Sequence, residues 1–144
     1  MMLTLMQFTR LGRIMQGIVR WKGGECLEGE TEGGIRVPIH TEDSPNPVQM
    51  VLLAHGACSM IDVVIGLKDR MTVVRDAWVE LDSTRRDEPP RRFTSVTMHY
   101  VIEGDVPEKL VRRIIEQSHA KLCSVGAMVI GAGASLDWTL EIRP

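Results

Sequence analysis

The chain has few cysteines, no recognisable export signal and almost no net charge. Three cysteines, Cys26, Cys58 and Cys123, stand among 144 residues. Small secreted domains held together by disulfides carry denser and usually even sets of cysteines. The first residues contain no basic segment, and their apolar stretch is too short for a signal peptide. We therefore expect a cytoplasmic protein in which any cysteine chemistry is catalytic or transient.

Several function classes are disfavoured because their signatures are missing. The formal net charge of −2 gives no electrostatic reason to expect nucleic acid or an anionic membrane as a partner. The sequence has no glycine-rich phosphate loop and no GxSxG serine elbow. Neither a CxxC nor an HxxxH pair is present to supply zinc ligands. We expect no metal and no cofactor.

One apolar run, residues 48–67, has about the length that crosses a bilayer. Gln49, His55, Ser59 and Asp62 interrupt this run. A charged residue in the middle of a span is costly in lipid, so we expect a buried helix of a soluble protein without membrane association.

What is present predicts a single α+β domain over residues 1–144. Hydrophobic residues make up 44% and charged residues 25% of the chain, which is ordinary for one globular domain of this length. Glycine pairs, a capped helix start and alternating apolar residues indicate the order of the elements. We expect an N-terminal β meander of three or four strands over 1–40, a central helix over 46–70, a β-hairpin over 72–103, helices over 106–130 and a terminal strand over 134–143.

The predicted central helix carries a polar stripe on an otherwise apolar surface. His55, Ser59, Asp62 and Asp69 follow one another at steps of four, three and seven residues, which places them on one side of a helix. The remaining circumference is apolar. Such a helix needs cover on several sides, and a second subunit can provide it.

Cys58 lies in the middle of this helix and allows two interpretations. An apolar environment raises the pKa of a thiol, as does an ionised Asp62 one turn later, so Cys58 can be inert core filler. Reactivity requires a nearby positive charge or a helix N-terminus. A helix break at Gly56 would create such an N-terminus beside the thiol.

Cys123 stands at a predicted helix start, near His119 and Lys121, and all three features can lower the pKa of a thiol. Together with Cys58 it allows a dithiol–disulfide cycle. In this cycle one thiolate attacks a peroxide O–O bond and becomes a sulfenic acid, the other thiol condenses with it, and a reductant restores the pair. The spacing of His119 and Cys123 also fits a Cys–His pair or half of a metal site, although further ligands are scattered.

The sequence resembles the OsmC/Ohr superfamily, and in particular its OsmC-like branch, in three places. Asn46-Pro47 followed by MVLLAHGACSMIDVV at residues 50–64 is similar to the central-helix signature of the superfamily. The segment KLCSV at residues 121–125 resembles its second signature, an aromatic residue followed by Cys-Ser/Pro-Val. The alternating terminal strand also matches, so the resemblance covers essentially the whole chain.

The resemblance implies an OsmC-like fold, an intertwined homodimer whose long central helices are enclosed by antiparallel β-sheets. It also implies a thiol-dependent peroxidase with peroxiredoxin-like chemistry that reduces organic hydroperoxides in oxidative-stress defence. Cys58 would be the peroxidatic thiolate and Cys123 the resolving thiol. Arg20 or Arg36, in the N-terminal β region, would activate the thiolate. The partners would be a peroxide and a dithiol reductant.

One departure from the superfamily pattern keeps two other interpretations open. Val48 stands where the well-characterised peroxidases have a glutamate that helps to hold the activating arginine. This favours a non-catalytic binding module, which would hold a small hydrophobic or thiol-bearing ligand at the dimer interface without turnover. It also favours a structural dimer with inert cysteines. The pairing of Cys58 with Cys123 favours the peroxidase.

Overall fold

The computed structural model describes residues 14–144, which form two compact units divided after Met50. In the first unit, β1 (Gly17–Trp21), β2 (Leu27–Thr31) and β3 (Arg36–Ile39) form an antiparallel sheet in that order. The sequence predicted three or four strands over residues 1–40. Three are present in the described part of that range, and residues 1–13 lie outside it.

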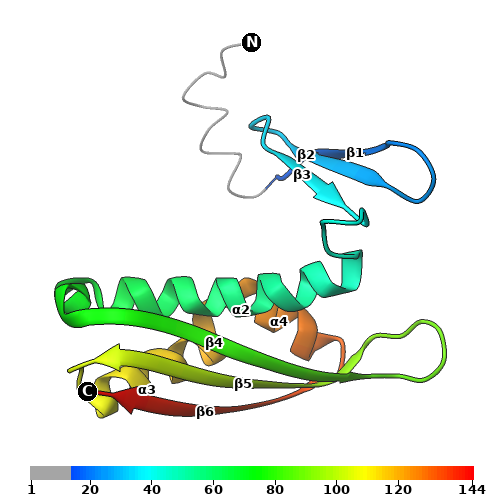
Figure 1. The fold of residues 1–144 in the computed structure, drawn as a ribbon. Coiled ribbons are helices and arrows are strands. Elements are labelled where there is room, and N and C mark those ends of the chain that lie inside the picture. Colours follow the sequence, from blue (N-terminus) through cyan, green and yellow to red (C-terminus); the bar gives the residue numbers. More distant parts are fainter. Residues whose placement is uncertain (1–13) are drawn as a thin grey trace. The chain divides into compact units, whose positions relative to one another are not determined.

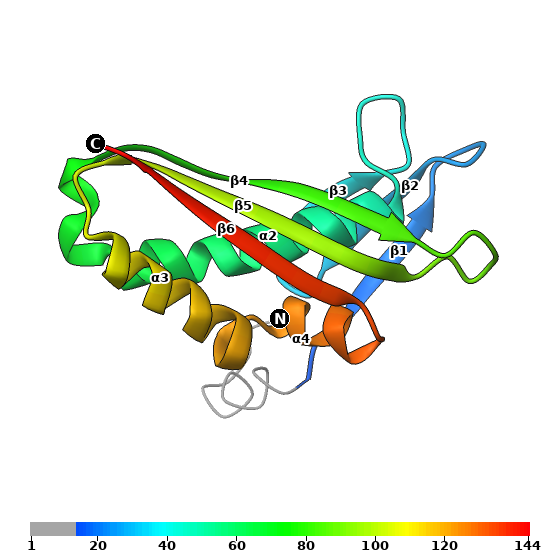
Figure 2. The same cartoon turned by 90° about the horizontal axis from the view of Figure 1, so that it is seen from below.

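The second unit, residues 51–144, is an α+β arrangement with helices along one face of a sheet (Figures 1 and 2). The sheet has the order β4-β5-β6. The elements from Pro47 onward are α2 (Pro47–Gly66), the 3-10 helix η1 (Lys68–Val73), β4 (Val74–Arg85), β5 (Phe93–Gly104), α3 (Glu108–Gln117), the π-helical turn η2 (Ser118–Leu122), α4 (Ser124–Gly131) and β6 (Ser135–Arg143). The predicted α+β class is confirmed, whereas the expectation that the chain is one domain stays a prediction.

Strand β5 supplies the centre of the core because its side chains alternate between the two faces of the sheet. Val96, Met98, Tyr100 and Ile102 are each at most 1% exposed. The intervening Thr97 is exposed. This is the alternation that the sequence predicted for the second strand of the hairpin.

Helix α2 approaches its neighbours closely at two glycines. A methyl group on Gly56 would lie 2.8 Å from the side chain of Leu81 on β4, and one on Gly66 would lie 2.8 Å from Ile114 on α3. Gly56 therefore permits close packing and does not break the helix, so the alternative of a new N-terminus beside Cys58 is excluded. The helix ends at Gly66, earlier than the predicted residue 70, and continues as η1.

The sheet of the second unit is mixed, which differs from the antiparallel sheets that the resemblance implied. Strands β4 and β5 are antiparallel, whereas β5 and β6 are parallel. The chain between β5 and β6 contains α3, η2 and α4, and this helical connection returns it to the end of the sheet at which β5 begins.

Several apolar side chains of α2, among them Leu53 and Ile61, are exposed in the part of the chain that the structure describes. By length and composition alone, Pro47–Gly66 is long and apolar enough to cross a membrane, and 22% of its most apolar window is buried. The buried residues of the helix are His55, Gly56, Ser59 and Val63. Its polar stripe, described below, is bonded to β5 and η2.

Candidate functional site

Cys58 and Cys123 come together although 64 residues separate them in the chain. Cys58 is half-buried in the middle of α2, and Cys123 is 4% exposed immediately before α4. The Cys58 thiol is close enough to Cys123 to raise the pKa of its thiol. Both are free cysteines. Folding thus joins the two thiols that the sequence singled out.

Cys123 holds its proton firmly. The pKa of its thiol is raised to about 11, chiefly because the sulfur is buried; Cys58 and the charge of Asp62 also act to raise it, whereas the backbone N–H of Gly126 acts to lower it. That N–H donates to Cys123 Sγ over 3.3 Å, because Cys123 caps the N-terminus of α4. The predicted helix start is present, but desolvation of the sulfur raises the pKa by more than the N-terminus of α4 lowers it. The sequence-based expectation of a lowered pKa is wrong.

His119 supplies no positive charge to this thiol at neutral pH. Burial lowers the pKa of its imidazole to about 4, with a further contribution from His55, while Asp62 acts in the opposite direction. Its Nε2 lies 2.9 Å from the hydroxyl of Tyr100. Within residues 14–144, no group of three or more His, Cys, Asp or Glu side chains is arranged to hold a metal ion. The expectation that the protein needs no metal stays a prediction.

A chain of buried hydrogen bonds joins α2 to β5 and η2 beside the two thiols. Ser118 Oγ donates to Asp62 Oδ2 over 2.8 Å, and Ser118 Oγ lies 3.0 Å from Ser59 Oγ. Ser59 Oγ lies 2.6 Å from the hydroxyl of Tyr100, which contacts His119. Tyr100, Ser59 and Ser118 are fully buried. The polar stripe of α2 is therefore one end of a continuous network.

The number of available protons fixes which group donates in each hydrogen bond of this network when Asp62 is a carboxylate. A carboxylate only accepts, and each hydroxyl has one proton to donate. Ser118 gives its proton to Asp62, so Ser59 must donate to Ser118 and Tyr100 to Ser59. His119 must then donate from Nε2, which leaves its Nδ1 as the acceptor nitrogen. That Nδ1 is buried and has no partner among the described residues.

His55 is the most unusual polar residue of this region. Its side chain is fully buried, and neither ring nitrogen has a hydrogen-bond partner in the part of the chain that the structure describes. Burial lowers the pKa of its imidazole, so the ring is neutral at pH 7. A methyl group on Gly126 would lie 2.9 Å from His55 Nε2 and 3.1 Å from Cys123 Sγ. The ring and the thiol therefore flank the same glycine.

Arg20 and Arg36, the predicted activators of the thiolate, belong to the N-terminal unit. Arg20 on β1 forms a hydrogen-bonded ion pair with Glu30 on β2, with 2.5 Å between Nη1 and Oε2. Arg36 on β3 lies 4.0 Å from a carboxylate oxygen of Glu28. Both pairs cross neighbouring strands. The assignment of either arginine to Cys58 stays a prediction.

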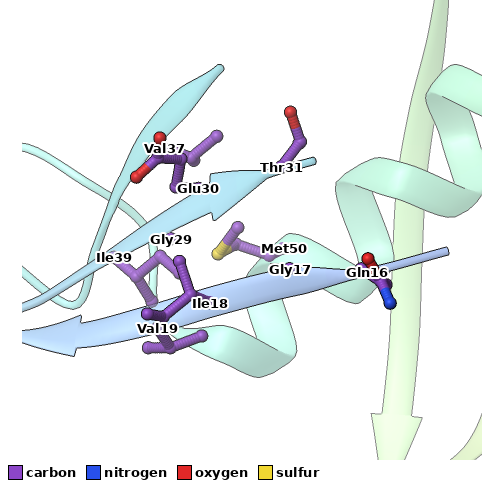
Figure 3. A pocket seen from close by; sticks show the side chains of 10 residues that line it. All are labelled: Gln16, Gly17, Ile18, Val19, Gly29, Glu30, Thr31, Val37, Ile39 and Met50. Atoms are coloured by element: carbon purple, nitrogen blue, oxygen red, sulfur yellow. The ribbon is translucent and has the colours of Figure 1, made fainter. Parts of the chain in front are cut away.

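The N-terminal unit also contains an open apolar hollow of about 260 Å³, shown in Figure 3. Ile18, Val37, Ile39 and Met50 provide much of its lining, and Glu30, the partner of Arg20, borders it. The lining residues come from the three strands, from Gln16 just before β1 and from the first turn of α2. Neither Cys58 nor Cys123 is among them.

Sequence reasoning missed Tyr100 and Ser118 and gave no role to His55. The stripe of His55, Ser59 and Asp62 was visible as a polar interruption of an apolar helix. A buried polar group requires a hydrogen-bond partner, so the stripe predicted partners without identifying them. Those partners lie 41 and 59 residues from Ser59, and only the tertiary structure brings them into contact.

We expect the Tyr100→Phe variant to lower the free energy of unfolding by about 1–3 kcal/mol, because Ser59 and His119 lose a buried partner. Urea unfolding followed by circular dichroism measures this. Thr84→Val is the matched control, since the Thr84 hydroxyl also bonds to two others but is exposed. Its expected change is within about 0.5 kcal/mol. Equal changes in the two variants would contradict a structural role for the buried network.

Comparisons with known proteins identify relatives over most of the chain. The family model described as OsmC-like protein matches residues 40–139. Protein YhfA of Escherichia coli K12 is 38% identical over 119 residues, which cover 80% of this chain and 89% of YhfA. A hypothetical protein from Aquifex aeolicus VF5 has a similar structure, with a TM-score of 0.78 at 26% identity over 92% of this chain and 99% of that one. The organic hydroperoxide resistance protein OsmC of Legionella pneumophila matches with a TM-score of 0.60 at 16% identity, over 91% and 97% of the two chains.

Proposed function

This chain belongs to the OsmC-like protein family, and we propose that it is a cysteine-based hydroperoxide reductase that acts in oxidative-stress defence. Family membership confirms the resemblance and the OsmC-like fold that the sequence predicted. The observation that carries the proposal is the pairing of a half-buried thiol, Cys58, with a buried and protonated one, Cys123. The name of the Legionella pneumophila structure, an organic hydroperoxide resistance protein, supports the choice of substrate class.

The proposed reaction has two chemical steps and a recovery. The Cys58 thiolate attacks the distal oxygen of a hydroperoxide, the O–O bond breaks, and an alcohol leaves after taking up a proton. The resulting Cys58 sulfenic acid condenses with the Cys123 thiol to give a disulfide and water. A dithiol reductant then reduces this disulfide and becomes oxidised itself.

The roles of the two cysteines follow from their environments. Cys123 is buried and holds its proton at neutral pH, so it is suited to wait as a thiol for the second step. Cys58 is the more accessible of the two. We assign the first attack to Cys58 and the condensation to Cys123. The positive charge that the first step requires is assigned to Arg20 or Arg36, and parallel Arg20→Gln and Arg36→Gln variants would distinguish them by the rate of Cys58 oxidation.

We further propose that the protein is a homodimer. The apolar residues of α2 that are exposed within the chain include Val51, Leu53, Ile61 and Ile65. In the N-terminal unit, Met15, Trp21 and Ile35 are also largely exposed. Large apolar side chains exposed in such numbers usually mark a protein interface. A second copy of the chain would cover them and accounts for the apolar character of α2.

Light scattering during size-exclusion chromatography is expected to give twice the chain mass of 16.1 kDa. The double variant Leu53→Lys with Ile61→Lys places two charges on the exposed side of α2 and should shift the protein to monomer. Glu116→Lys, on the exposed side of α3, is the control and should leave the dimer intact. A monomeric wild type would exclude the homodimer.

The catalytic proposal is tested by the consumption of cumene hydroperoxide and hydrogen peroxide in the presence of a dithiol reductant. We expect turnover, with faster consumption of the organic hydroperoxide. A protein that binds cumene hydroperoxide without consuming it would instead be a binding module of the same fold. Absence of both binding and consumption would leave a structural dimer with inert cysteines.

A further inference from the structure

We infer that His55 is the general base for the second step of the proposed reaction, in which it takes the proton from Cys123 as that thiol attacks the sulfenic acid of Cys58. The inference rests on the proposed function, because it assigns a residue to the condensation of the two cysteines. It concerns only residues of the second unit.

The first argument is the state of the His55 side chain. A buried polar group without a hydrogen-bond partner destabilises a fold by about 1–3 kcal/mol, so it usually has a partner or a function. His55 is fully buried, and both of its ring nitrogens are without partners among residues 14–144. His119 also has one buried nitrogen without a partner among these residues, Nδ1, but its Nε2 is held by the hydroxyl of Tyr100. His55 therefore has a lone pair that the resting structure does not use.

The second argument is the position of this ring relative to Cys123. The Nε2 of His55 and the Sγ of Cys123 approach the same side of the Gly126 Cα, where a methyl group would lie 2.9 Å from one and 3.1 Å from the other. Glycine leaves only a hydrogen atom at this point. The Cys123 thiol is oriented toward the carbonyl oxygen of His55, with 4.0 Å between sulfur and oxygen. The thiol therefore lies next to the backbone of His55 and meets the ring of the same residue at Gly126.

The third argument is that the second step requires a base. With a pKa of about 11, only about one Cys123 in ten thousand is ionised at pH 7. The titratable groups around the pair are Cys58 and Asp62 on α2, His119 on η2 and Tyr100 on β5. Asp62 accepts from Ser118, and burial raises the pKa of Tyr100 well above its ordinary value, which leaves it protonated at pH 7. His119 is neutral and its Nδ1 has no partner among the described residues, but the imidazole that meets Cys123 at Gly126 is that of His55, which is also neutral.

The condensation of the two cysteines is balanced in protons when His55 acts as the base. His55 takes the proton from Cys123 while the Cys123 sulfur forms the S–S bond with the sulfenic sulfur of Cys58. The S–O bond of the sulfenic acid breaks, and its oxygen leaves as hydroxide. The imidazolium returns its proton to that hydroxide, and water departs. No external acid or base is needed, because His55 ends the step neutral.

The test follows the two steps separately in the full-length protein. Wild type and His55→Asn receive one equivalent of cumene hydroperoxide at pH 6–9, and quenched samples are analysed by intact mass for the sulfenic acid and for the disulfide. We expect unchanged formation of the Cys58 sulfenic acid and disulfide formation slowed by about 100-fold in His55→Asn at pH 7. His99→Asn, a histidine on β5 that bonds to Thr139, is the matched control and should behave as wild type.

The pH profile separates a base from a residue that only shapes the site. Without His55 the step should depend on free thiolate, so its rate should rise about tenfold per pH unit over this range. In wild type the rate should become nearly independent of pH once the imidazole is neutral. The same steep profile in both proteins would overturn the inference. His55→Gln is a second variant in case His55→Asn fails to fold, which circular dichroism reveals.

A second arm keeps this outcome distinct from failure of the peroxidase proposal. In a Cys58→Ser background, Cys123 reacts with methyl methanethiosulfonate, which needs its thiolate but no peroxide. Adding His55→Asn should slow this reaction by about tenfold or more at pH 7. Unchanged reactivity would overturn the role of His55. If wild type instead forms no sulfenic acid with cumene hydroperoxide, the proposed function fails, while this arm still decides whether His55 deprotonates Cys123.

Discussion

We expect the Cys58→Ser variant to lose cumene hydroperoxide consumption by about three orders of magnitude or more, because a serine hydroxyl is far less nucleophilic than a thiolate. Cys58 lies within α2, and Ser59 beside it already carries a buried hydroxyl, so serine at position 58 should be accommodated. The measurement is the initial rate with excess dithiol reductant.

Cys123→Ser should give a different pattern from Cys58→Ser. The first step would persist, so one equivalent of hydroperoxide is consumed and the Cys58 sulfenic acid accumulates. Steady-state turnover would then depend on direct attack of the reductant on that sulfenic acid. Trapping with dimedone followed by mass spectrometry should find the adduct on Cys58 only.

Cys26→Ser provides the matched control for both variants. Cys26 belongs to the N-terminal unit, at the turn that precedes β2, and should be dispensable. Full activity in Cys58→Ser would exclude the proposed reductase. Equal losses in Cys26→Ser and Cys58→Ser would mean that the assay reports folding and not chemistry.

The second large effect is expected at Gly126. In the Gly126→Ala variant the new methyl group would lie 2.9 Å from His55 Nε2 and 3.1 Å from Cys123 Sγ, so the ring, the thiol or the start of α4 must move. We expect the free energy of unfolding to fall by about 1–3 kcal/mol, because the site is closely packed on both sides. Urea unfolding measures this, and a parallel disulfide-formation assay should show a slower second step.

Gly131 lies in the same helix and gives a matched comparison. A methyl group there would meet no atom within 4 Å. Because alanine loses less conformational entropy than glycine in a helix, Gly131→Ala should leave stability unchanged or raise it by up to about 1 kcal/mol. Destabilisation of similar size in both variants would show that the cost arises from the loss of glycine itself and not from contact with His55 and Cys123.

The element order could be read from the sequence because local patterns determine it. The apolar run of residues 48–67 is too long for a strand, and the alternation at β5 and β6 is typical of strands with one covered face. The ends of the helices and strands were harder to predict where tertiary packing overrides the local secondary-structure preference. Helix α2 ends at Gly66, and that glycine lies against Ile114, a contact that no local pattern reveals.

Of the candidate site, the sequence by itself determined which residues carry chemistry: two cysteines in recognisable segments and a polar stripe on an apolar helix. Only the tertiary structure decided their chemical state. The helix start at Cys123 suggested an acidic thiol, but burial of the same sulfur reverses the direction of its pKa shift. Tyr100 on β5 and Ser118 on η2 supply the hydrogen-bond partners of the polar stripe, and His55 and Cys123 both lie against Gly126. The physical reason is that desolvation and hydrogen bonding depend on which groups meet in space, whereas residue type and periodicity depend only on order along the chain.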